Sequence, residues 1–256
     1  MGPSDEHLFI DPDAEQASPD AGGPRLGRLR PRSHEVTITI VLVGVVVSLI
    51  VVGLLRRDPV ASAPRVAVVG DSLTMQASWA IDDRLGGDGW LVAVSGRNGA
   101  TIGDQYDQLI SYTGFDGADV LVAALGTNNA YYVTVDDDRR LSRAATIDEL
   151  DRAVHDILQG PPQRTWEVSV RCLVWVNVRD DTSGLQLDAQ APALNAEIAA
   201  RAAAEREAGR QMLVADWAAR SRDHDEWFVA DGVHLTPEGQ RAYAELIGET
   251  VAACER

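Results

Sequence analysis

The sequence predicts an α/β domain with a five-stranded parallel sheet between two layers of helices, preceded by one transmembrane helix. From Arg65 onward, short β-branched runs alternate with longer helix-like runs, the order typical of a parallel sheet. Polar segments that contain glycine follow several of these strand-like runs. Ahead of the alternation, Val36–Leu55 contains no charged residue. The pattern therefore indicates a folded α/β domain attached to a membrane segment.

Five strands and five main helices are expected from this alternation. The strands are predicted at Arg65–Val69, Trp90–Val94, Asp119–Leu125, within Val168–Val178, and at Gln211–Asp216. The helices are predicted at Met75–Leu85, Ile102–Tyr112, Ile147–Leu158, Pro192–Arg206 and Pro237–Ala253. The segment Gly126–Ile147 is expected to be a loop that helps to shape a ligand pocket. Right-handed crossovers between the strands give a three-layer α/β/α sandwich.

The amino-terminal part is expected to anchor the chain in a membrane. Residues 1–35 are rich in Pro, Gly, Asp and Arg and are predicted to form a disordered cytoplasmic tail. As a helix, Val36–Leu55 would span about 30 Å, the thickness of a bilayer core. Four arginines precede this span closely and only Arg56 and Arg57 follow it directly, which favours an exported carboxyl-terminal domain. Residues 56–64 form a short linker to the domain of residues 65–256.

A cleaved signal peptide is the competing interpretation of the same segment. Ala61-Ser62-Ala63 resembles a small-residue cleavage site. The uncharged run is, however, longer than the usual apolar core of about 7–15 residues, and a long charged tail precedes it. An uncleaved, single-pass signal anchor is therefore favoured.

Composition excludes some classes of function. The formal net charge of -16 argues against a nucleic-acid partner. All 23 basic residues are arginine. The two cysteines, Cys172 and Cys254, lack the spacing of a structural zinc site, and both a disulfide and two free thiols are left open. The acidic run Asp136–Asp138 has no EF-hand spacing and is expected to be a solvated loop. No metal and no cofactor is expected.

Ser72 is the candidate nucleophile. The run Gly70-Asp71-Ser72 joins the first predicted strand to the first helix, so the Ser72 hydroxyl is expected at the carboxyl edge of the sheet, where ligands bind. The Ser72 backbone N–H would lie in the first turn of a helix, at the positive end of its dipole. This position suits a nucleophile whose reaction develops an oxyanion.

His234 is the candidate general base. Asp231 and His234 lie three residues apart on the loop before the last helix, where Thr236 and Pro237 are expected to start that helix. A carboxylate at this spacing can hold one imidazole nitrogen while the other faces a serine. The other four histidines are His7, His34, His155 and His224.

Those four histidines are less suited to the role of general base. His7 and His34 lie before the span, and His155 lies on a predicted amphipathic helix where a surface position is expected. His224 is ambiguous and is placed in a loop. The neighbouring Trp227 and Phe228 either pack in the core or form a wall of an acyl pocket.

Two further loops supply candidate oxyanion donors. Ser95–Asp104 follows the second predicted strand and contains Gly99 and Gly103, and Gly126–Asn129 follows the third. Glycine lets a backbone N–H approach a ligand closely, and an asparagine amide donates without carrying a charge. Turn chemistry alone would explain each loop, but it does not predict both loops after successive strands of one sheet.

These motifs together resemble the SGNH, or GDSL, family of serine esterases and acyltransferases over about residues 65–253. Gly70–Leu73 resembles the first block of that family, Gly126–Asn128 the third and Asp231–His234 the fifth, while Asn98–Asp104 is the best match to the second. The resemblance implies a flavodoxin-like sandwich and an acyl-enzyme mechanism.

The resemblance also implies roles for individual residues. Ser72 attacks the acyl carbonyl, His234 is general base and then general acid, and Asp231 orients His234. The oxyanion is held by the Ser72 N–H, the Asn128 amide and the Gly103 N–H, with Gly99 as the alternative to Gly103.

A narrower likeness links Val174–Arg179 and Trp227-Phe228 to the serine domains of cell-envelope O-acetyltransferases. Those domains commonly accompany a multi-span acyl-donor domain, so a transferase of this kind would need a separate donor protein. The leading expectation is a membrane-anchored, exported serine ester hydrolase that acts on a small-molecule or glycan ester. The alternatives are an O-acyltransferase or O-acetylesterase that acts on an envelope glycan, and an inactive binding domain.

Overall fold

The computed structural model describes residues 41, 43–48, 63–114, 117–134, 141–163, 167–181 and 186–254. The chain divides into two compact units, Met1–Arg57 and Asp58–Arg256. In the first unit only residues 41 and 43–48 are described, and they are helical. Within the described part of the chain, no helix is both long and apolar enough to cross a bilayer. Most of the predicted span Val36–Leu55, and the acidic run Asp136–Asp138, lie outside the described residues.

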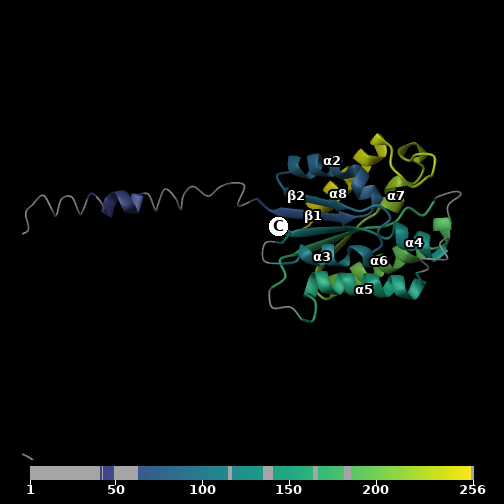
Figure 1. Ribbon diagram of the computed structural model, residues 1–256, viewed down its shortest axis with the longest axis horizontal. Helices are drawn as coiled ribbons and strands as arrows, with labels where there is room; N and C mark the ends of the chain where they lie inside the picture. The colour runs from purple at the N-terminus through teal and green to yellow at the C-terminus, as the bar shows by residue number, and fades with distance from the viewer. Residues whose placement is uncertain are drawn as a thin grey trace, which may run out of the picture. The chain divides into compact units, whose positions relative to one another are not determined.

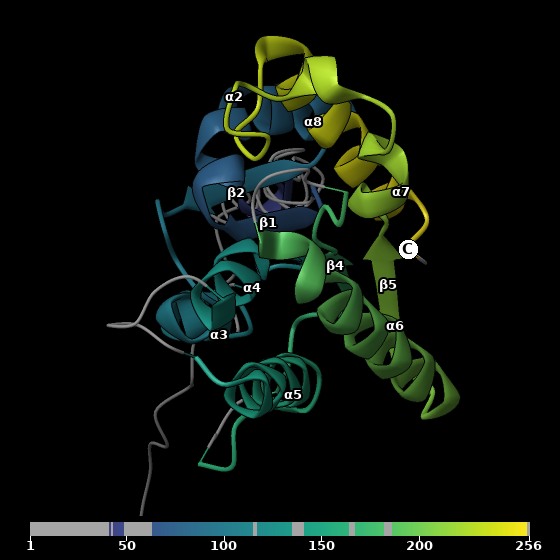
Figure 2. The ribbon, with the colours of Figure 1, turned by 90° about the vertical axis from the view of Figure 1, so that its right-hand side faces the viewer.

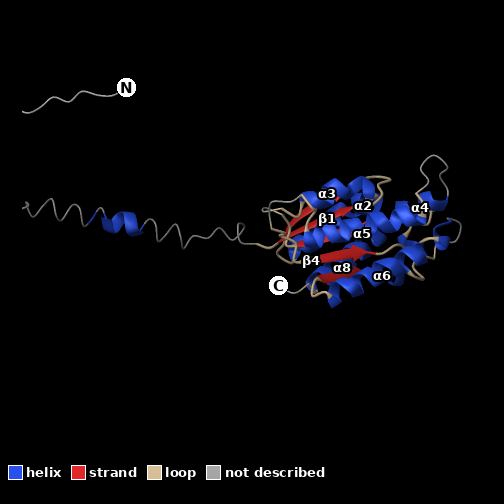
Figure 3. Ribbon diagram, turned by 90° about the horizontal axis from the view of Figure 1, so that it is seen from below, coloured by secondary structure: helices blue, strands red, loops and turns tan. Residues whose placement is uncertain are grey.

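The second unit contains the predicted five-stranded parallel sheet, which confirms the α/β fold class (Figure 1; Figure 3). Along the sheet the strand order is β2-β1-β3-β4-β5. The strands are β1 (Arg65–Gly70), β2 (Leu91–Gly96), β3 (Val120–Ala124), β4 (Cys172–Val176) and β5 (Gln211–Ala215). The chain first moves from β1 to β2 on one side and then crosses back to β3 on the other side of β1. The carboxyl ends of β1 and β3 therefore border a switch point of the kind that binds ligands in open α/β sheets.

Helices cover both faces of this sheet (Figure 1; Figure 2). One face carries α2 (Ser72–Gly87), α7 (Trp217–Ser221) and α8 (Pro237–Ala252), and the other carries α3 (Tyr106–Ser111), α5 (Arg143–Gln159) and α6 (Ala191–Glu207). Alternate residues of β1 face the two layers, with Val66 and Val68 in one apolar core and Ala67 and Val69 in the other. Burial on both faces explains the continuous apolar run of this strand.

Several elements differ from the predicted ones. The expected helix at residues 102–112 is a 3-10 turn, Gly103–Gln105, followed by α3. The expected loop after β3 begins with α4 (Thr127–Thr134), and α7 and two further 3-10 turns, Gln186–Ala189 and Asp225–Trp227, were not predicted. All of these elements are too short to show a clear 3.6-residue apolar period, so only tertiary packing defines them.

The connection from β1 to α2 places Ser72 as predicted. A Cβ atom at Gly70 would lie 2.0 Å from Thr74 Oγ1 and 2.8 Å from the Ala124 carbonyl oxygen, so only glycine fits this crossing. Asp71 then caps α2, because its Oδ1 accepts a hydrogen bond of 3.0 Å from the Leu73 N–H. The helix therefore begins at Ser72, directly beyond the carboxyl end of β1.

The loop that carries Asp231 and His234 is closed at its base. Phe228 and Leu235 form an antiparallel bridge, and the Val229 N–H donates to the His234 carbonyl oxygen at 2.8 Å. The Leu235 N–H donates to Gln76 Oε1 of α2 at 3.1 Å, which fastens this base beside Ser72. Thr236 caps α8 as predicted, by accepting from the Gly239 N–H.

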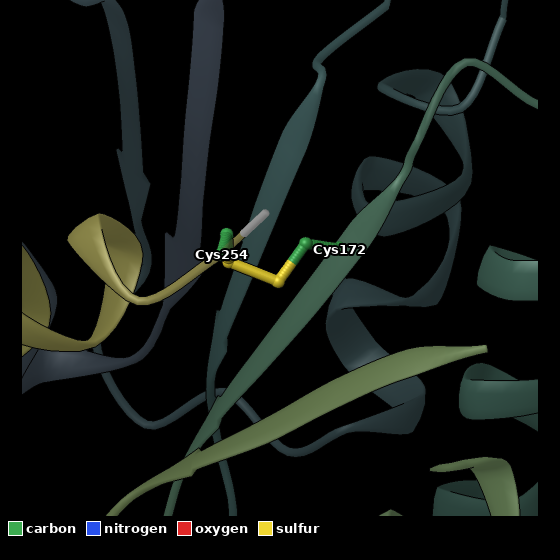
Figure 4. Close-up of a disulfide and its surroundings, with 2 residues drawn as sticks. All are labelled: Cys172 and Cys254. Carbon is green, nitrogen blue, oxygen red and sulfur yellow. A yellow bond between two sulfur atoms is a disulfide. The ribbon is translucent and has the colours of Figure 1, made fainter. Parts of the chain in front are cut away.

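Cys172 and Cys254 form a disulfide, so the first of the two alternatives is the observed one (Figure 4). Cys172 is the first residue of β4, and Cys254 follows the end of α8. Their Cα atoms are 6.0 Å apart. The bond therefore ties the end of α8 to the amino edge of the sheet, opposite the edge at which α8 begins.

Candidate active site

A cavity of about 260 Å³ lies at the carboxyl edge of the sheet. It is lined by residues from the loops after β1, β2 and β3, from α4 and from the loop before α8: Ser72, Asn98, Thr127, Asn128, Tyr131, Leu187, Asp231, Val233 and His234. Leu187 comes from the 3-10 turn after β4. The cavity thus gathers the three predicted catalytic residues and two of the three predicted oxyanion donors, Ser72 and Asn128, at a single site.

Ser72, His234 and Asp231 form a continuous hydrogen-bonded chain. His234 Nε2 lies 3.1 Å from Ser72 Oγ, and His234 Nδ1 lies 2.6 Å from Asp231 Oδ2. With a proton on Nδ1 donated to the Asp231 carboxylate, Nε2 presents a lone pair to the Ser72 hydroxyl. This is the arrangement that deprotonates a serine nucleophile as it attacks.

Asp231 is held in the ionised form by its surroundings. Burial opposes ionisation, but hydrogen bonds from the His234 ring and from the Val233 and His234 N–H groups outweigh it and lower the pKa of Asp231 below its ordinary value. Both backbone groups donate to Oδ1 at 2.9 Å, which leaves Oδ2 for the imidazole. The carboxylate is therefore fixed in position as well as charged.

Asn128 presents its amide to the cavity from the first turn of α4. Its Nδ2 donates to the Ala100 carbonyl oxygen at 3.0 Å and lies 3.4 Å from Asp71 Oδ2. These two acceptors define which end of the amide is nitrogen. The longer contact, to Asp71, is the weaker of the two.

The two glycine candidates on the loop after β2 have different surroundings. The Gly103 N–H donates to Glu149 Oε2 at 3.1 Å, and Gly103 does not line the cavity. Gly99 has φ +67, which favours glycine, and its N–H donates no hydrogen bond to any of the described residues. In the chain, Gly99 lies between Asn98, which lines the cavity, and Ala100, whose carbonyl oxygen accepts from the Asn128 amide. The geometry therefore favours Gly99 over Gly103 as the backbone donor.

Asp71 is a buried carboxyl group beside the site that the sequence motifs did not single out as functional. Burial raises its pKa to about 7, although the Leu73 N–H, the charge of His234 and the Thr127 hydroxyl oppose the shift. An aspartate between a strand and a helix start is a helix-cap signal, and that signal could have identified its position. Its contact with Asn128 could not be predicted from the sequence.

His155, His224, Trp227 and Phe228 do not line the cavity, and His7 and His34 lie outside the described residues. His155 is on the surface of α5, with 53% of its side chain exposed, and its Nδ1 lies 2.9 Å from Asp156 Oδ1. His224 stacks on Trp227 with ring centroids 3.8 Å apart. Phe228 is buried in the core, and Trp227 stacks on Trp217, so packing is the observed role of both aromatic residues.

Comparison with known proteins shows the fold of this domain. No family model and no curated protein sequence matches the chain. A GDSL-like lipase from Bacteroides thetaiotaomicron is similar in structure, with a TM-score of 0.54 and 14% identity over 75% of this chain and 89% of that one. A member of the lipolytic G-D-S-L family from Veillonella parvula matches with a TM-score of 0.54 and 16% identity over 73% and 97% of the two chains.

A third similar structure is the carboxyl-terminal catalytic domain of a peptidoglycan O-acetyltransferase from Streptococcus pneumoniae. Its TM-score is 0.52, with 17% identity over 75% of this chain and 94% of that one. The domain of residues 65–254 therefore has the fold of the SGNH/GDSL hydrolases, as the motifs predicted.

Proposed function

We propose that the protein is a serine ester hydrolase that cleaves an acyl or acetyl ester through a Ser72-linked acyl-enzyme. The observation that carries this proposal is the hydrogen-bonded chain from Ser72 through His234 to Asp231 in the wall of a cavity. The fold and the sequence blocks around these residues support it. Such an arrangement needs no metal or cofactor for acyl transfer.

The proposed reaction has two stages. Ser72 Oγ bonds to the acyl carbon while His234 Nε2 takes the hydroxyl proton, and the carbonyl oxygen becomes an oxyanion. The Ser72 and Gly99 N–H groups and the Asn128 amide stabilise that charge. His234 then gives the proton to the leaving oxygen, which breaks the ester bond. Water, deprotonated by His234, attacks the acyl-enzyme and releases the acid and free Ser72.

Substitution of Ser72 tests this mechanism. Ser72→Ala removes the nucleophile and is expected to lower kcat for p-nitrophenyl acetate by at least about 10³. A fluorophosphonate probe should label the wild-type chain and not this variant. Ser111→Ala, which changes an exposed serine on α3, is the matched control and should keep both properties. Full activity in Ser72→Ala would refute the proposal, and failure of the probe to label folded wild-type protein would favour an inactive binding domain.

The second candidate is O-acyl transfer to or from an envelope glycan with the same residues. It is supported by the similarity to a peptidoglycan O-acetyltransferase domain and to a carbohydrate esterase from Clostridium thermocellum. In transfer, a sugar hydroxyl takes the place of water on the acyl-enzyme, and a separate acyl donor is needed. Measuring acetate release against formation of acetylated oligosaccharide distinguishes the two reactions.

We also propose that Val36–Leu55 anchors the chain in a membrane and that the domain lies outside the cytoplasm. The uncharged run and the excess of arginine before it support the anchor. The Cys172–Cys254 disulfide is consistent with an oxidising compartment. A tag placed before Val36 should stay with the membrane fraction, and added protease should reach the domain in spheroplasts. Loss of the tag from the mature protein would instead indicate cleavage.

A further inference from the structure

Arg179 is a buried cation at the carboxyl edge of the sheet that the proposed reaction does not use. It follows β4, and only 7% of its side chain is exposed. The guanidinium makes three hydrogen bonds, from Nε to Asp181 Oδ1 at 2.6 Å, from Nη2 to Asp225 Oδ1 at 2.7 Å and from Nη1 to the Gly232 carbonyl oxygen at 3.1 Å. Its Cζ also lies over the Phe228 ring, 3.8 Å from the centroid.

Three of these four partners lie in one segment, residues 225–232, which leads into the His234 loop. Asp225 starts the 3-10 turn before the loop, and Phe228 forms the bridge at its base. Gly232 directly follows Asp231, so Arg179 binds the peptide unit next to the carboxylate that orients His234. The fourth partner, Asp181, lies on the same connection as Arg179 itself.

The tip of this loop is largely exposed, apart from Val233, which packs against both apolar cores. Val229 is 45% exposed, and so is the Asp231 side chain at 45%. Among the described residues, the Gly232 N–H bonds only within the tip, to the Val229 carbonyl oxygen at 2.9 Å. The bond from Arg179 to the Gly232 carbonyl oxygen joins this tip to the end of β4.

Arginine is suited to this position in a way that lysine is not. Its planar fork directs three nitrogens to three separate acceptors while its face stacks on an aromatic ring. A lysine ammonium is a single point charge that cannot reach all three acceptors from one position. A buried charge also needs paired partners, and Asp181 and Asp225 supply them.

From these contacts we infer that Arg179 is a positioning residue, which fixes residues 225–232 so that Asp231 keeps His234 aligned with Ser72. This inference rests on the proposed function for its effect on rate. A shift of about 1 Å in a catalytic group can cost about 100-fold in rate even when its cause is remote from the chemistry. The effect should therefore appear in kcat rather than in substrate binding.

Two substitutions in the full-length chain test the inference. Arg179→Met keeps an unbranched stem that reaches as far as the arginine Nε position and removes every polar contact. We expect kcat for p-nitrophenyl acetate to fall about 10- to 100-fold with KM nearly unchanged. Arg179→Lys should recover only part of this loss. The matched control is Arg171→Met, which removes an arginine that pairs with Asp119 at the opposite end of β4 and should leave kcat unchanged.

A spectroscopic measurement separates this inference from the proposed function. The proton between His234 Nδ1 and Asp231 gives a downfield NMR resonance, which should be sharp in wild type and Arg171→Met and weakened in both Arg179 variants. If that pattern appears in a chain without esterase activity, the proposed function fails and the positioning role stands. Unchanged kcat and an unchanged resonance in folded Arg179→Lys or Arg179→Met would overturn the inference. So would a proportional rise in KM with the resonance intact.

Discussion

The two edges of the sheet differ in the residues that they carry, although the same strands and helices run between them. At the carboxyl edge, Ser72 and His234 face a cavity, and two carboxyl groups, Asp71 and Asp231, have pKa values moved in opposite directions. At the amino edge, a disulfide joins Cys172 to Cys254, and no group with a role in the proposed reaction is found among the described residues there.

Asp119 shows how the amino edge is constructed. One of its carboxylate oxygens accepts from the Arg65 N–H at 2.8 Å, and the other pairs with Arg171 at 3.1 Å. These contacts join the starts of three neighbouring strands. The comparison teaches that β4 and α8 each have one end held by structural bonds and the other end beside the candidate site. Changes at the two edges should therefore have separable effects on stability and on activity.

The largest effect is expected from Asp231→Asn. An asparagine amide at this position donates to His234 Nδ1, which forces the imidazole proton onto Nε2. Because Nε2 then carries the proton, it can no longer accept the hydrogen bond from the Ser72 hydroxyl. We expect kcat to fall by about 10⁴. The measurement is ester hydrolysis at saturating substrate, together with urea unfolding to verify the fold. Asp119→Asn, at the opposite edge, is the control and should change stability without lowering kcat; equal kcat losses in the two variants would break the comparison.

The second effect concerns the disulfide. Replacing Cys172 and Cys254 with alanine opens a loop with a sequence separation of 82 residues. The free energy of unfolding should fall by about 2–5 kcal/mol. At a temperature where the variant remains folded, kcat should be unchanged, because the bond lies at the edge away from Ser72. Denaturant unfolding with and without reductant measures the stability change, and a large loss of kcat in the folded variant would contradict the separation of the two edges.

A third, smaller effect should distinguish two neighbouring asparagines. Asn128→Ala removes the proposed oxyanion donor and should lower kcat by about 10²–10³. Asn129 is fully buried, accepts from the Ile102 N–H at 2.9 Å and donates to Glu149. Asn129→Ala should instead lower stability by about 1–3 kcal/mol, because it leaves a buried N–H unpaired. Measuring kcat and the free energy of unfolding of both variants tests this contrast. If Asn128→Ala lost stability but kept its kcat, the assignment of the two roles would be contradicted.

The features that could be predicted from the sequence are those that local patterns encode. Ser72, Asp231 and His234 were predictable because each belongs to a local pattern, a strand followed by a capped helix or a loop before one. The five strands were predictable from continuous apolar runs such as that of β1. These signals depend on residues close together in the chain.

The remaining features depend on contacts between distant segments. Gly99 and Gly103 both suit a tight approach by sequence, and what separates them is the Glu149 contact of Gly103 and the positive φ of Gly99, neither of which the sequence shows. Arg179 lies 53 residues from Gly232, and no local pattern indicates their hydrogen bond. The cysteines are 82 residues apart, so their pairing required the fold. Helix α4 was missed because its sequence has no clear apolar stripe.

The smallest effect concerns the pH dependence contributed by Asp71. Burial raises its pKa to about 7, whereas an unfolded aspartate titrates near its ordinary value of 3.8. Between these values the folded protein holds a proton that the unfolded chain has lost, so this group makes stability fall as pH rises. The slope is at most about 1.4 kcal/mol per pH unit.

Asp71→Asn should remove that slope, since asparagine does not titrate and is as good a helix cap as aspartate. Replacing the carboxyl oxygen near Asn128 Nδ2 with a second amide nitrogen adds a cost that is the same at every pH, so the slope and not the absolute stability is the readout. Urea unfolding of both proteins at pH 5 and pH 6 measures it. The opposite contribution of Asp231, whose lowered pKa makes stability fall as pH decreases, is common to both proteins and cancels. Parallel pH profiles would show that Asp71 is not protonated in this range and that the carboxyl edge carries a buried charge beside Ser72.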